Sequence, residues 1–277
     1  MKTFLVPVVL IIFGHTEGFD IKRLHPVGSH FEDASALKEN GRHSAVPKII
    51  GGVSASLGEI PFQVSVDVDG YWFNGGAIIH PWYILTNAFY APEAKTFTIY
   101  AGVIKRHGDE SSRQVMVATE KYVHEDFNKT TMQANIALLK LPKGLEFNQY
   151  VSAAYLPAND YSFANEVAWV SGWGNDHIHG EYAPTLQVAK VTIISNEECL
   201  KAWPDYVVSS TLCTAAEYGV GECNGDAGGP LFTNSTVGTR SLLVGIVNFH
   251  AASSCGKEPD VYTRVSSYRQ WIENHIE

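Results

Sequence analysis

Residues 62–72 read Phe-Gln-Val-Ser-Val-Asp-Val-Asp-Gly-Tyr-Trp. Apolar and polar side chains alternate through Val68, which is the pattern of a β-strand with one buried face. Asp69 and Gly70 then supply a hairpin turn, because both residue types tolerate the left-handed backbone that such a turn requires. The stretch therefore predicts a half-buried strand that turns back into a second strand.

Similar short apolar stretches, separated by Gly, Pro, Asn and Asp, recur at residues 77–85, 96–103, 136–141, 167–170, 186–194 and 241–247. Many short strands with turn signals and no fixed repeat predict an all-β barrel or sandwich. One helix is expected at the C-terminus, where apolar residues at helical spacing are Val265, Tyr268, Ile272 and Ile276. Ser267 and Gln270 would form its capping box.

Composition sets the broad class of protein. Of the 277 residues, 45% are hydrophobic and 18% are charged, which is enough apolar surface to build a core and argues against a disordered chain. The 20 Lys and Arg are outnumbered by 29 Asp and Glu, so the formal net charge is −9. An acidic surface repels phosphate backbones and anionic lipids, so we expect neither nucleic acid nor a membrane as a partner.

The N-terminus predicts export. Lys2 precedes an apolar run over residues 4–13, about half of the ~20 residues that span a bilayer, and small or polar residues follow. Residues 1–18 are therefore interpreted as a signal peptide, with a buried N-terminal strand or helix as the alternative. Residues 19–48 are polar and aperiodic, so we expect an exposed leader before a folded domain at 49–277. The mature protein is expected to be secreted and extracellular.

The cysteines agree with an extracellular protein. There are four, Cys199, Cys213, Cys223 and Cys255. An even number in an exported chain predicts two disulfides, and three pairings are possible. No Cys-x-x-Cys spacing is present, and we expect no metal and no cofactor.

Other polar motifs carry weaker signals. Asn128 and Asn234 each begin an N-x-Ser/Thr sequence and are candidate glycosylation sites. A displaced base or a metal pair could be sought at residues 124–126 (His-Glu-Asp) or 176–179 (Asp-His-Ile-His). Polar clusters between strand-like runs are more often solvated loops, which is the interpretation we prefer.

Residues 225–230 read Gly-Asp-Ala-Gly-Gly-Pro. Consecutive small residues let backbone N–H groups point at one place, as in an oxyanion hole, although a tight structural turn is the alternative. Six further blocks occur in order at 48–52 (KIIGG), 74–76 (NGG), 85–90 (LTNAFY), 135–139 (NIALL), 171–174 (SGWG) and 259–265 (PDVYTRV). Together these motifs resemble the chymotrypsin/trypsin family over residues 49–277.

The resemblance implies two packed six-stranded antiparallel barrels with a C-terminal helix and a cleft between them. It also implies that residues 19–48 are a propeptide, cut after Lys48 by a trypsin-like protease, and that the new amino group of Ile49 pairs with Asp226. The implied disulfides are Cys199–Cys213 and Cys223–Cys255. The disulfide that braces the family's histidine loop is missing, because Asn74 and Tyr90 stand at its positions.

The catalytic positions depart from the family. Matched motif by motif, the histidine position is Phe89, the aspartate position is Asn135 and the serine position is Ala227. Acyl transfer by a triad needs a hydroxyl nucleophile, an imidazole base and a carboxylate that orients the base. None of the three is present, and loss of such a triad lowers turnover by ~10⁶. We therefore expect an inactive homologue of the serine endopeptidases.

The implied specificity pocket is altered as well. Gly221 stands at its floor and Asp260 on its wall, a combination that resembles chymotrypsin-like enzymes of arthropods and that could attract a basic or polar side chain. His250 replaces the glycine of a Ser-Trp-Gly strand that lines the substrate, and it would narrow the entrance. The alternative is a pocket that is partly filled by its own side chains.

These features lead to three functional hypotheses. The first is a secreted pseudoprotease that binds proteases, inhibitors or surface proteins as a cofactor, decoy or regulator of proteolysis. The second is a residual endopeptidase or esterase that uses the backbone N–H groups of Gly225 and Ala227. The third is a bulk secreted protein without a specific partner.

Overall fold

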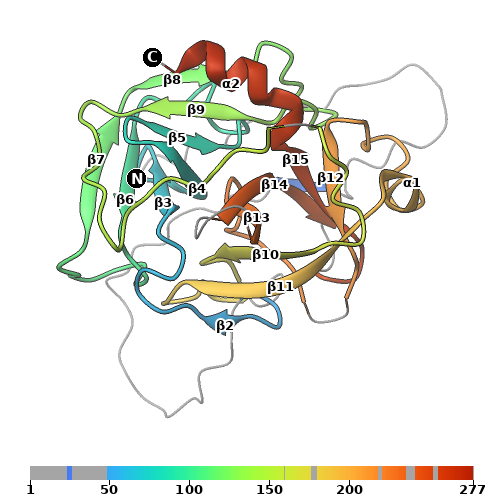
Figure 1. Cartoon of the computed structure of the whole chain (residues 1–277), viewed down its shortest axis with the longest axis horizontal. Coiled ribbons are helices and arrows are strands. Elements are labelled where there is room, and N and C mark those ends of the chain that lie inside the picture. Colours follow the sequence, from blue (N-terminus) through green and yellow to red (C-terminus); the bar gives the residue numbers. More distant parts are fainter. Residues whose placement is uncertain are drawn as a thin grey trace, which may run out of the picture.

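The computed structural model describes residues 24–26, 49–158, 160–175, 180–217, 220–234, 241–251 and 255–276. The predicted signal peptide and Lys48 lie outside these residues, as does the leader apart from residues 24–26. Two antiparallel sheets form the protein and lie side by side, with the last helix packed over one of them (Figure 1).

The first sheet contains β3 (Gln63–Val68), β4 (Trp72–His80), β5 (Tyr83–Thr86), β6 (Phe97–Ala101), β7 (Gln114–Ala118), β8 (Glu120–Val123) and β9 (Ala137–Lys140). Their order in the sheet is β7-β6-β3-β4-β5-β9-β8. Only Thr119 separates β7, which pairs with β6, from β8, which pairs with β9. The two form a single bent strand that closes the sheet into a barrel of six strands.

The second sheet has six principal strands, β10 (Val167–Gly172), β11 (Gln187–Ile194), β12 (Thr211–Thr214), β13 (Pro230–Asn234), β14 (Ser241–Ala251) and β15 (Asp260–Arg264). Pairing of β14 with β15 closes this sheet too. Two short strands are added to it, β2 (Val53–Ser54) beside β11 and β1 (Leu24–Pro26) beside β14. The predicted pair of six-stranded antiparallel barrels is confirmed.

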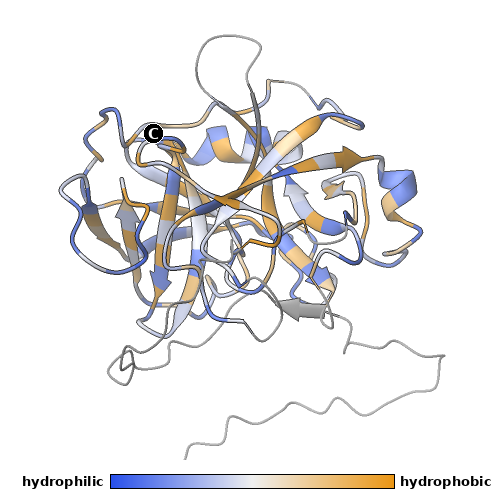
Figure 2. Ribbon diagram, turned by 90° about the horizontal axis from the view of Figure 1, so that it is seen from below, coloured by the Kyte–Doolittle hydropathy of each residue, from blue (hydrophilic) through white to orange (hydrophobic). Residues whose placement is uncertain are grey.

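The strand predicted within residues 62–72 is present as β3, but it is almost wholly buried instead of half-buried. Its polar side chains Gln63 and Ser65 are only 2% and 4% exposed, and Gln63 contacts the second sheet. There the Ser171 hydroxyl donates to Gln63 Oε1 at 2.6 Å. Hydrophobic and hydrophilic residues alternate along the strands (Figure 2), and in β3 the polar residues Gln63 and Ser65 are buried as well.

The predicted turn is confirmed. Asp69 and Gly70 both have positive φ, 54° and 74°, and the Asp69 carboxylate accepts hydrogen bonds from the backbone N–H groups of Lys95 and Thr96. The apolar stretch 77–85 is not one strand, because Pro81 and Trp82 form a turn between β4 and β5.

The C-terminal helix is confirmed, with a different start. Residues Val265–Tyr268 form a 3₁₀ turn and the α-helix α2 runs over Arg269–His275, so the predicted capping box is wrong. Tyr268 is the N-cap and makes no capping bond. The other α-helix of the described residues, α1, is the single turn Asn196–Cys199. None of the helices that the structure describes has the length and apolar character to span a bilayer.

Both implied disulfides are present. Cys199 pairs with Cys213 and Cys223 with Cys255, at sequence separations of 14 and 32. In the loop-entropy model each link of this size contributes about 3 kcal/mol to stability. The second disulfide fixes the segment that precedes the 225–230 motif, and so it positions the candidate site.

Candidate functional site

A chain of hydrogen bonds joins the neighbours of Phe89, Asn135 and Ala227, the three positions that the resemblance assigns to a catalytic triad. The N–H of Ala88, next to Phe89, donates to Asn135 Oδ1 at 2.8 Å. Asn135 Nδ2 donates to Asn248 Oδ1 at 2.6 Å. From the other side, the N–H of Gly228, next to Ala227, donates to the carbonyl of Val247 at 3.0 Å. The fold thus brings positions 89, 135 and 227 to one place, as the motif order predicts.

This place lies where the two barrels meet. Ala227 precedes β13 of the second barrel, and its carbonyl accepts a 2.7 Å hydrogen bond from the N–H of Gly75 in β4 of the first. Thr86 at the end of β5 donates to the carbonyl of Gly75 at 2.8 Å. Gly75 has to be glycine, since an added Cβ would lie 2.7 Å from the Cα of Gly229.

Hydrogen bonds on both side-chain atoms fix the position of Asn135. Asn135 is fully buried. Its side-chain oxygen accepts one hydrogen bond and its side-chain nitrogen donates one. Thr263 Oγ1 donates to the backbone carbonyl of Asn135 at 2.9 Å. Asn248 continues the network by donating from Nδ2 to the carbonyl of Met132 at 3.0 Å. No carboxylate is present in this network, so it cannot stabilise an imidazolium.

Phe89 belongs to an aromatic group at the histidine position. Its ring meets Tyr90 edge to face at 4.9 Å between centroids, and Lys129 Nζ lies 4.7 Å from its centroid. Tyr90 stacks on Trp72 at 4.7 Å. Asn74 Nδ2 donates to Asn87 Oδ1 at 3.1 Å. The resemblance places a disulfide brace at positions 74 and 90. Here Asn74 makes a hydrogen bond between side-chain amides and Tyr90 makes a ring stack instead.

The backbone of the 225–230 motif is retained, but a tyrosine packs against it. Gly225 has φ 97°, and a Cβ added there would lie 2.5 Å from Cε1 of Tyr182. Arg106 lies over the Tyr182 ring, with its guanidinium carbon 4.1 Å from the ring centroid. Arg106 also lies over Phe73, 4.8 Å from that centroid. Sequence reasoning missed Tyr182, since no motif marks it.

Asp226 is a fully buried carboxylate. It accepts hydrogen bonds from the N–H groups of Gly174 at 2.8 Å and Cys223 at 3.0 Å. Burial raises the pKa of Asp226 to about 7 despite these two bonds. Ile49 is also buried, with φ 62°, and in the uncut chain its nitrogen is an uncharged amide. The ion pair of Ile49 with Asp226 therefore stays a prediction for the cut form.

The pocket positions contain a second carboxylate that sequence reasoning missed. Glu222 lies between Gly221 and Cys223 and is 0% exposed, and its N–H donates to Asp260 Oδ2 at 3.1 Å. Both Glu222 carboxylate oxygens and Asp260 Oδ1 lack a hydrogen-bond partner among the described residues. Gly221 leaves the space that Asp260 Oδ2 fills. The sequence signal that could have identified Glu222 is its position next to Cys223, which forms a disulfide.

Burial and mutual repulsion perturb these acids. Burial raises the pKa of Asp260 to about 8, and the charge of Asp226 adds to the rise. Burial raises the pKa of Glu222 well above its usual range, with repulsion from Asp260 and Asp226 as further causes. Three carboxyl groups thus share one low-dielectric region with no basic side chain bonded to them among the described residues.

His250 is fully buried in β14. Its Nδ1 lies 2.9 Å from the carbonyl oxygen of Ala251 and 3.9 Å from Cys255 Sγ. His250 groups with Cys223 and Cys255 at metal-ligand distances, but both sulfurs are used by the disulfide. The pocket side chains Glu222, His250 and Asp260 are all buried in this conformation.

The remaining sequence candidates lie elsewhere. Asn128 is exposed, as glycosylation requires, whereas the side chain of Asn234 lies outside the described residues, as does the cluster 176–179. His124 packs against Tyr268 and Trp271, and Trp271 Nε1 donates to Glu125 Oε2 at 3.0 Å. That cluster holds the C-terminal helix against the first barrel.

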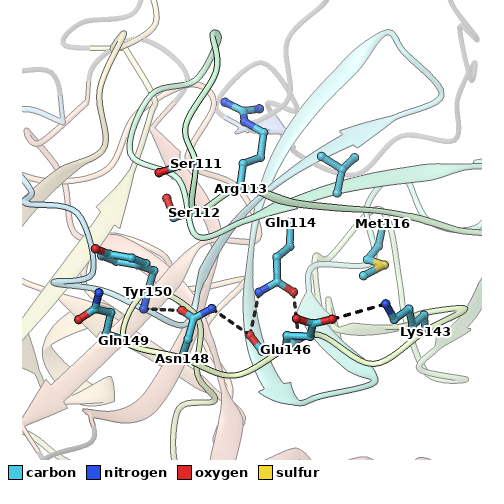
Figure 3. Close-up of a pocket in the computed structure, with 11 residues that line it drawn as sticks. Ser111, Ser112, Arg113, Gln114, Met116, Lys143, Glu146, Asn148, Gln149 and Tyr150 are labelled. Carbon is cyan, nitrogen blue, oxygen red and sulfur yellow. Dashed lines mark hydrogen bonds and ion pairs between the residues drawn. The ribbon is translucent and has the colours of Figure 1, made fainter.

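A cavity of about 720 Å³ lies outside the candidate site (Figure 3). It opens between β7 and residues 143–150, and none of the sequence-predicted site residues lines it. Gln114 spans one end, donating from Nε2 to the carbonyl of Glu146 at 2.7 Å and accepting from its N–H at 2.9 Å. Lys143 and Glu146 form an ion pair of 3.6 Å at its rim.

Comparison with known proteins agrees with this geometry. A family model described as Trypsin matches residues 49–272. Among solved structures, one described as HL collagenase is similar, with a TM-score of 0.74 and 29% sequence identity. The match covers 83% of this chain and 100% of the collagenase chain.

Proposed function

Because the chain belongs to the trypsin family, we propose that it is a secreted, catalytically silent member that binds a protein partner as a cofactor, decoy or regulator of proteolysis. The motif match carries the proposal: Ala227, Phe89 and Asn135 stand where the family motifs have the nucleophile, the base and the orienting acid. Ala227 has no nucleophilic atom and Phe89 cannot accept a proton.

Cleavage after Lys48 is the proposed switch. It would convert the amide nitrogen of Ile49 into an ammonium, and Asp226 is a buried carboxylate without a basic side chain bonded to it among the described residues. An ion pair between them would compensate the buried charge and order the surrounding segment. A trypsin-like protease is the proposed activator, since the bond follows a lysine.

The pocket supports recognition of a cationic side chain. Glu222 and Asp260 contribute carboxylate oxygens that lack partners, and a guanidinium placed between them would satisfy those oxygens. Opening of the pocket is required, because both acids are buried in this conformation. Arginine-bearing loops of proteases, inhibitors or surface proteins are therefore the proposed ligands.

Peptide binding tests this preference. Two extended peptides that differ only in a central Arg or Gln are titrated with protein cut after Lys48, and anisotropy gives each Kd. The Arg peptide is expected to bind about tenfold more tightly, equivalent to roughly 1.4 kcal/mol. The ratio of the Gln-peptide Kd to the Arg-peptide Kd should rise from pH 6 to pH 9. The reason is that the pKa of Asp260 is raised to about 8, and its ionised carboxylate attracts the cation.

Matched variants make this test specific. The double variant Glu222→Gln, Asp260→Asn should remove the Arg preference, whereas Asp109→Asn, at an exposed acid of the other barrel, should leave it unchanged. Equal affinities of the unaltered protein for the two peptides at pH 9 would contradict a cation-selective pocket.

The proposed function has its own experiment. Protein cut after Lys48 is crosslinked in its native secretion and partners are identified by mass spectrometry, with uncut Lys48→Gln protein as the control. A partner joined to cleft residues of the cut form only, and recovered uncleaved, supports the proposal. Absence of any such partner favours the bulk secreted protein, and a cleaved partner favours the residual hydrolase. The hydrolase alternative would rely on the backbone N–H groups of Gly225 and Ala227, and Tyr182 packs beside Gly225.

A further inference from the structure

The leader contributes one strand to the folded domain. Residues Leu24–Pro26 form β1, which pairs antiparallel with β14 in the register Leu24 to Ala251, His25 to His250 and Pro26 to Phe249. In Figure 1 this short blue strand lies against β14 in the second barrel, far in sequence from everything around it. A segment that precedes the proposed cleavage site thus completes a sheet edge of the domain that follows it.

The edge that β1 covers is the edge of the candidate site. One side of β14 pairs with β15, as far as Phe249 opposite Val261. The other side pairs with β13 as far as Ile246, and then Val247 exchanges hydrogen bonds with Gly228 and Gly229 of the 225–230 motif. At Phe249 both sides are occupied again, by β15 and by β1. The leader strand therefore pairs with β14 on the same side as the 225–230 motif, next to that motif along the strand.

Asn248 connects this edge of β14 with Asn135, one of the positions assigned to the triad. It stands directly before the residues that β1 pairs with, and its Oδ1 accepts the 2.6 Å hydrogen bond from Asn135. An extended peptide lying along Phe249–Ala251 would therefore run beside positions 135 and 227. Adding a strand to an exposed sheet edge is a general mode of peptide recognition, in which backbone hydrogen bonds supply the affinity.

We propose that the leader strand Leu24–Pro26 occupies, within the same molecule, the peptide-binding edge of β14, so that the uncut protein blocks its own cleft. This inference rests on the proposed function, since it assigns the regulation of that binding site. Cleavage after Lys48 then has two effects. It creates the Ile49 ammonium, and it turns an intramolecular strand into a separate peptide that dissociates upon dilution.

Two features of the chain fit release of the leader. All four cysteines lie between residues 199 and 255 and are paired there, so no disulfide retains the leader after cleavage. Pro26 has no backbone N–H, so β1 has only the donors of Leu24 and His25 for its ladder. So short a strand binds weakly on its own and depends on its covalent link for occupancy.

Hydrogen exchange tests the blocked edge. All proteins carry Lys48→Gln so that they stay intact, and the exchange rates of the His250 and Ala251 amides are measured. The double variant Leu24→Pro, His25→Pro removes both donors of β1 and should raise the exchange rate of at least one of these amides about tenfold. The matched control Ser29→Pro, His30→Pro, in the same leader but outside β1, should leave both rates unchanged.

A peptide added in trans gives a second readout. A labelled synthetic peptide of residues 21–29 should bind Leu24→Pro, His25→Pro protein at least tenfold more tightly than protein with the native leader. A scrambled peptide of the same composition is the control. Equal binding to both proteins, together with equal exchange rates, would overturn the proposal. Protection that disappears upon dilution would also overturn it, because the occupant would then be the leader of a second copy.

These outcomes are separate from those of the proposed function. Exchange and peptide binding are measured on the protein alone, and they need neither a partner nor the absence of catalysis. A protein that proved to be a hydrolase could still release its leader, and a true binding protein could fail both leader tests.

Discussion

Protein cut after Lys48 is expected to hydrolyse peptide bonds ~10⁶-fold more slowly than an active member of its family, which is the effect of removing a whole triad. The expectation follows from Ala227, where no hydroxyl is available, and from Phe89, where no proton acceptor is available. Incubation with a mixture of unstructured peptides for a day, followed by mass spectrometry, measures the residual rate. Hydrolysis within tenfold of the active relative, in material free of contaminating proteases, would contradict it.

Restoration of the triad residues is expected to recover little of this rate. In the triple variant Phe89→His, Asn135→Asp, Ala227→Ser, one oxygen of the new carboxylate would replace Asn135 Nδ2 and face Asn248 Oδ1 at 2.6 Å. Two acceptors at that distance repel, and Asn248 Nδ2 is already committed to the carbonyl of Met132. The new imidazole would also lie under Lys129, a cation that disfavours its protonation.

A fourth substitution separates these causes. Asn248→Ser, added to the triple variant, supplies a hydroxyl that can donate to the new carboxylate, and we expect it to raise hydrolysis at least tenfold over the triple variant. Lys129→Gln, added instead, tests the cation alone. If the triple variant already equals the quadruple variant, the amide network at Asn135 is not the obstacle. Crowding by Tyr182 at Gly225 would then be the next candidate.

The motifs predicted the architecture because they mark backbone constraints. Gly75 and Gly228 permit close approach of the two barrels, and the cysteines lie where the disulfides form. The structure brings the matched positions Phe89, Asn135 and Ala227 close together, and their assignment to the triad stays a prediction. The alternating strand 62–68 misled about burial, because its polar face meets another barrel, a tertiary contact that one strand's pattern does not contain.

The parts of the site that sequence reasoning missed depend on contacts distant in the chain. Tyr182 lies against Gly225 and packs on Arg106 and Phe73, all distant in sequence. Glu222 interacts with Asp260, which is 38 residues away. The leader strand β1 is three residues long and carries no alternation to detect. The capping box failed because Val265–Tyr268 form a 3₁₀ turn, which places the start of the α-helix after Ser267.

The uncut protein is expected to become less stable as the pH rises from about 4 to about 8. Burial raises the folded-state pKa of Asp226 to about 7 and that of Asp260 to about 8, and it raises the pKa of Glu222 as well. In the unfolded chain these acids titrate near 4, so within this window the folded state binds more protons than the unfolded state. The free energy of unfolding therefore falls with rising pH across this window.

Urea unfolding of Lys48→Gln protein at pH 4.5, 6 and 8 measures this slope. Glu222→Gln should flatten it and stabilise the protein at pH 8, because both carboxylate oxygens of Glu222 lack partners and one of the three repelling charges is removed. The exposed control Asp109→Asn should not change it. Unaltered protein cut after Lys48 should show a smaller slope than the uncut form, since the Ile49 ammonium favours the ionised form of Asp226. Stability that rises from pH 4.5 to pH 8 in the uncut protein would mean that the three acids are solvated or paired in solution, and the cation-selective pocket would lose its physical basis with them.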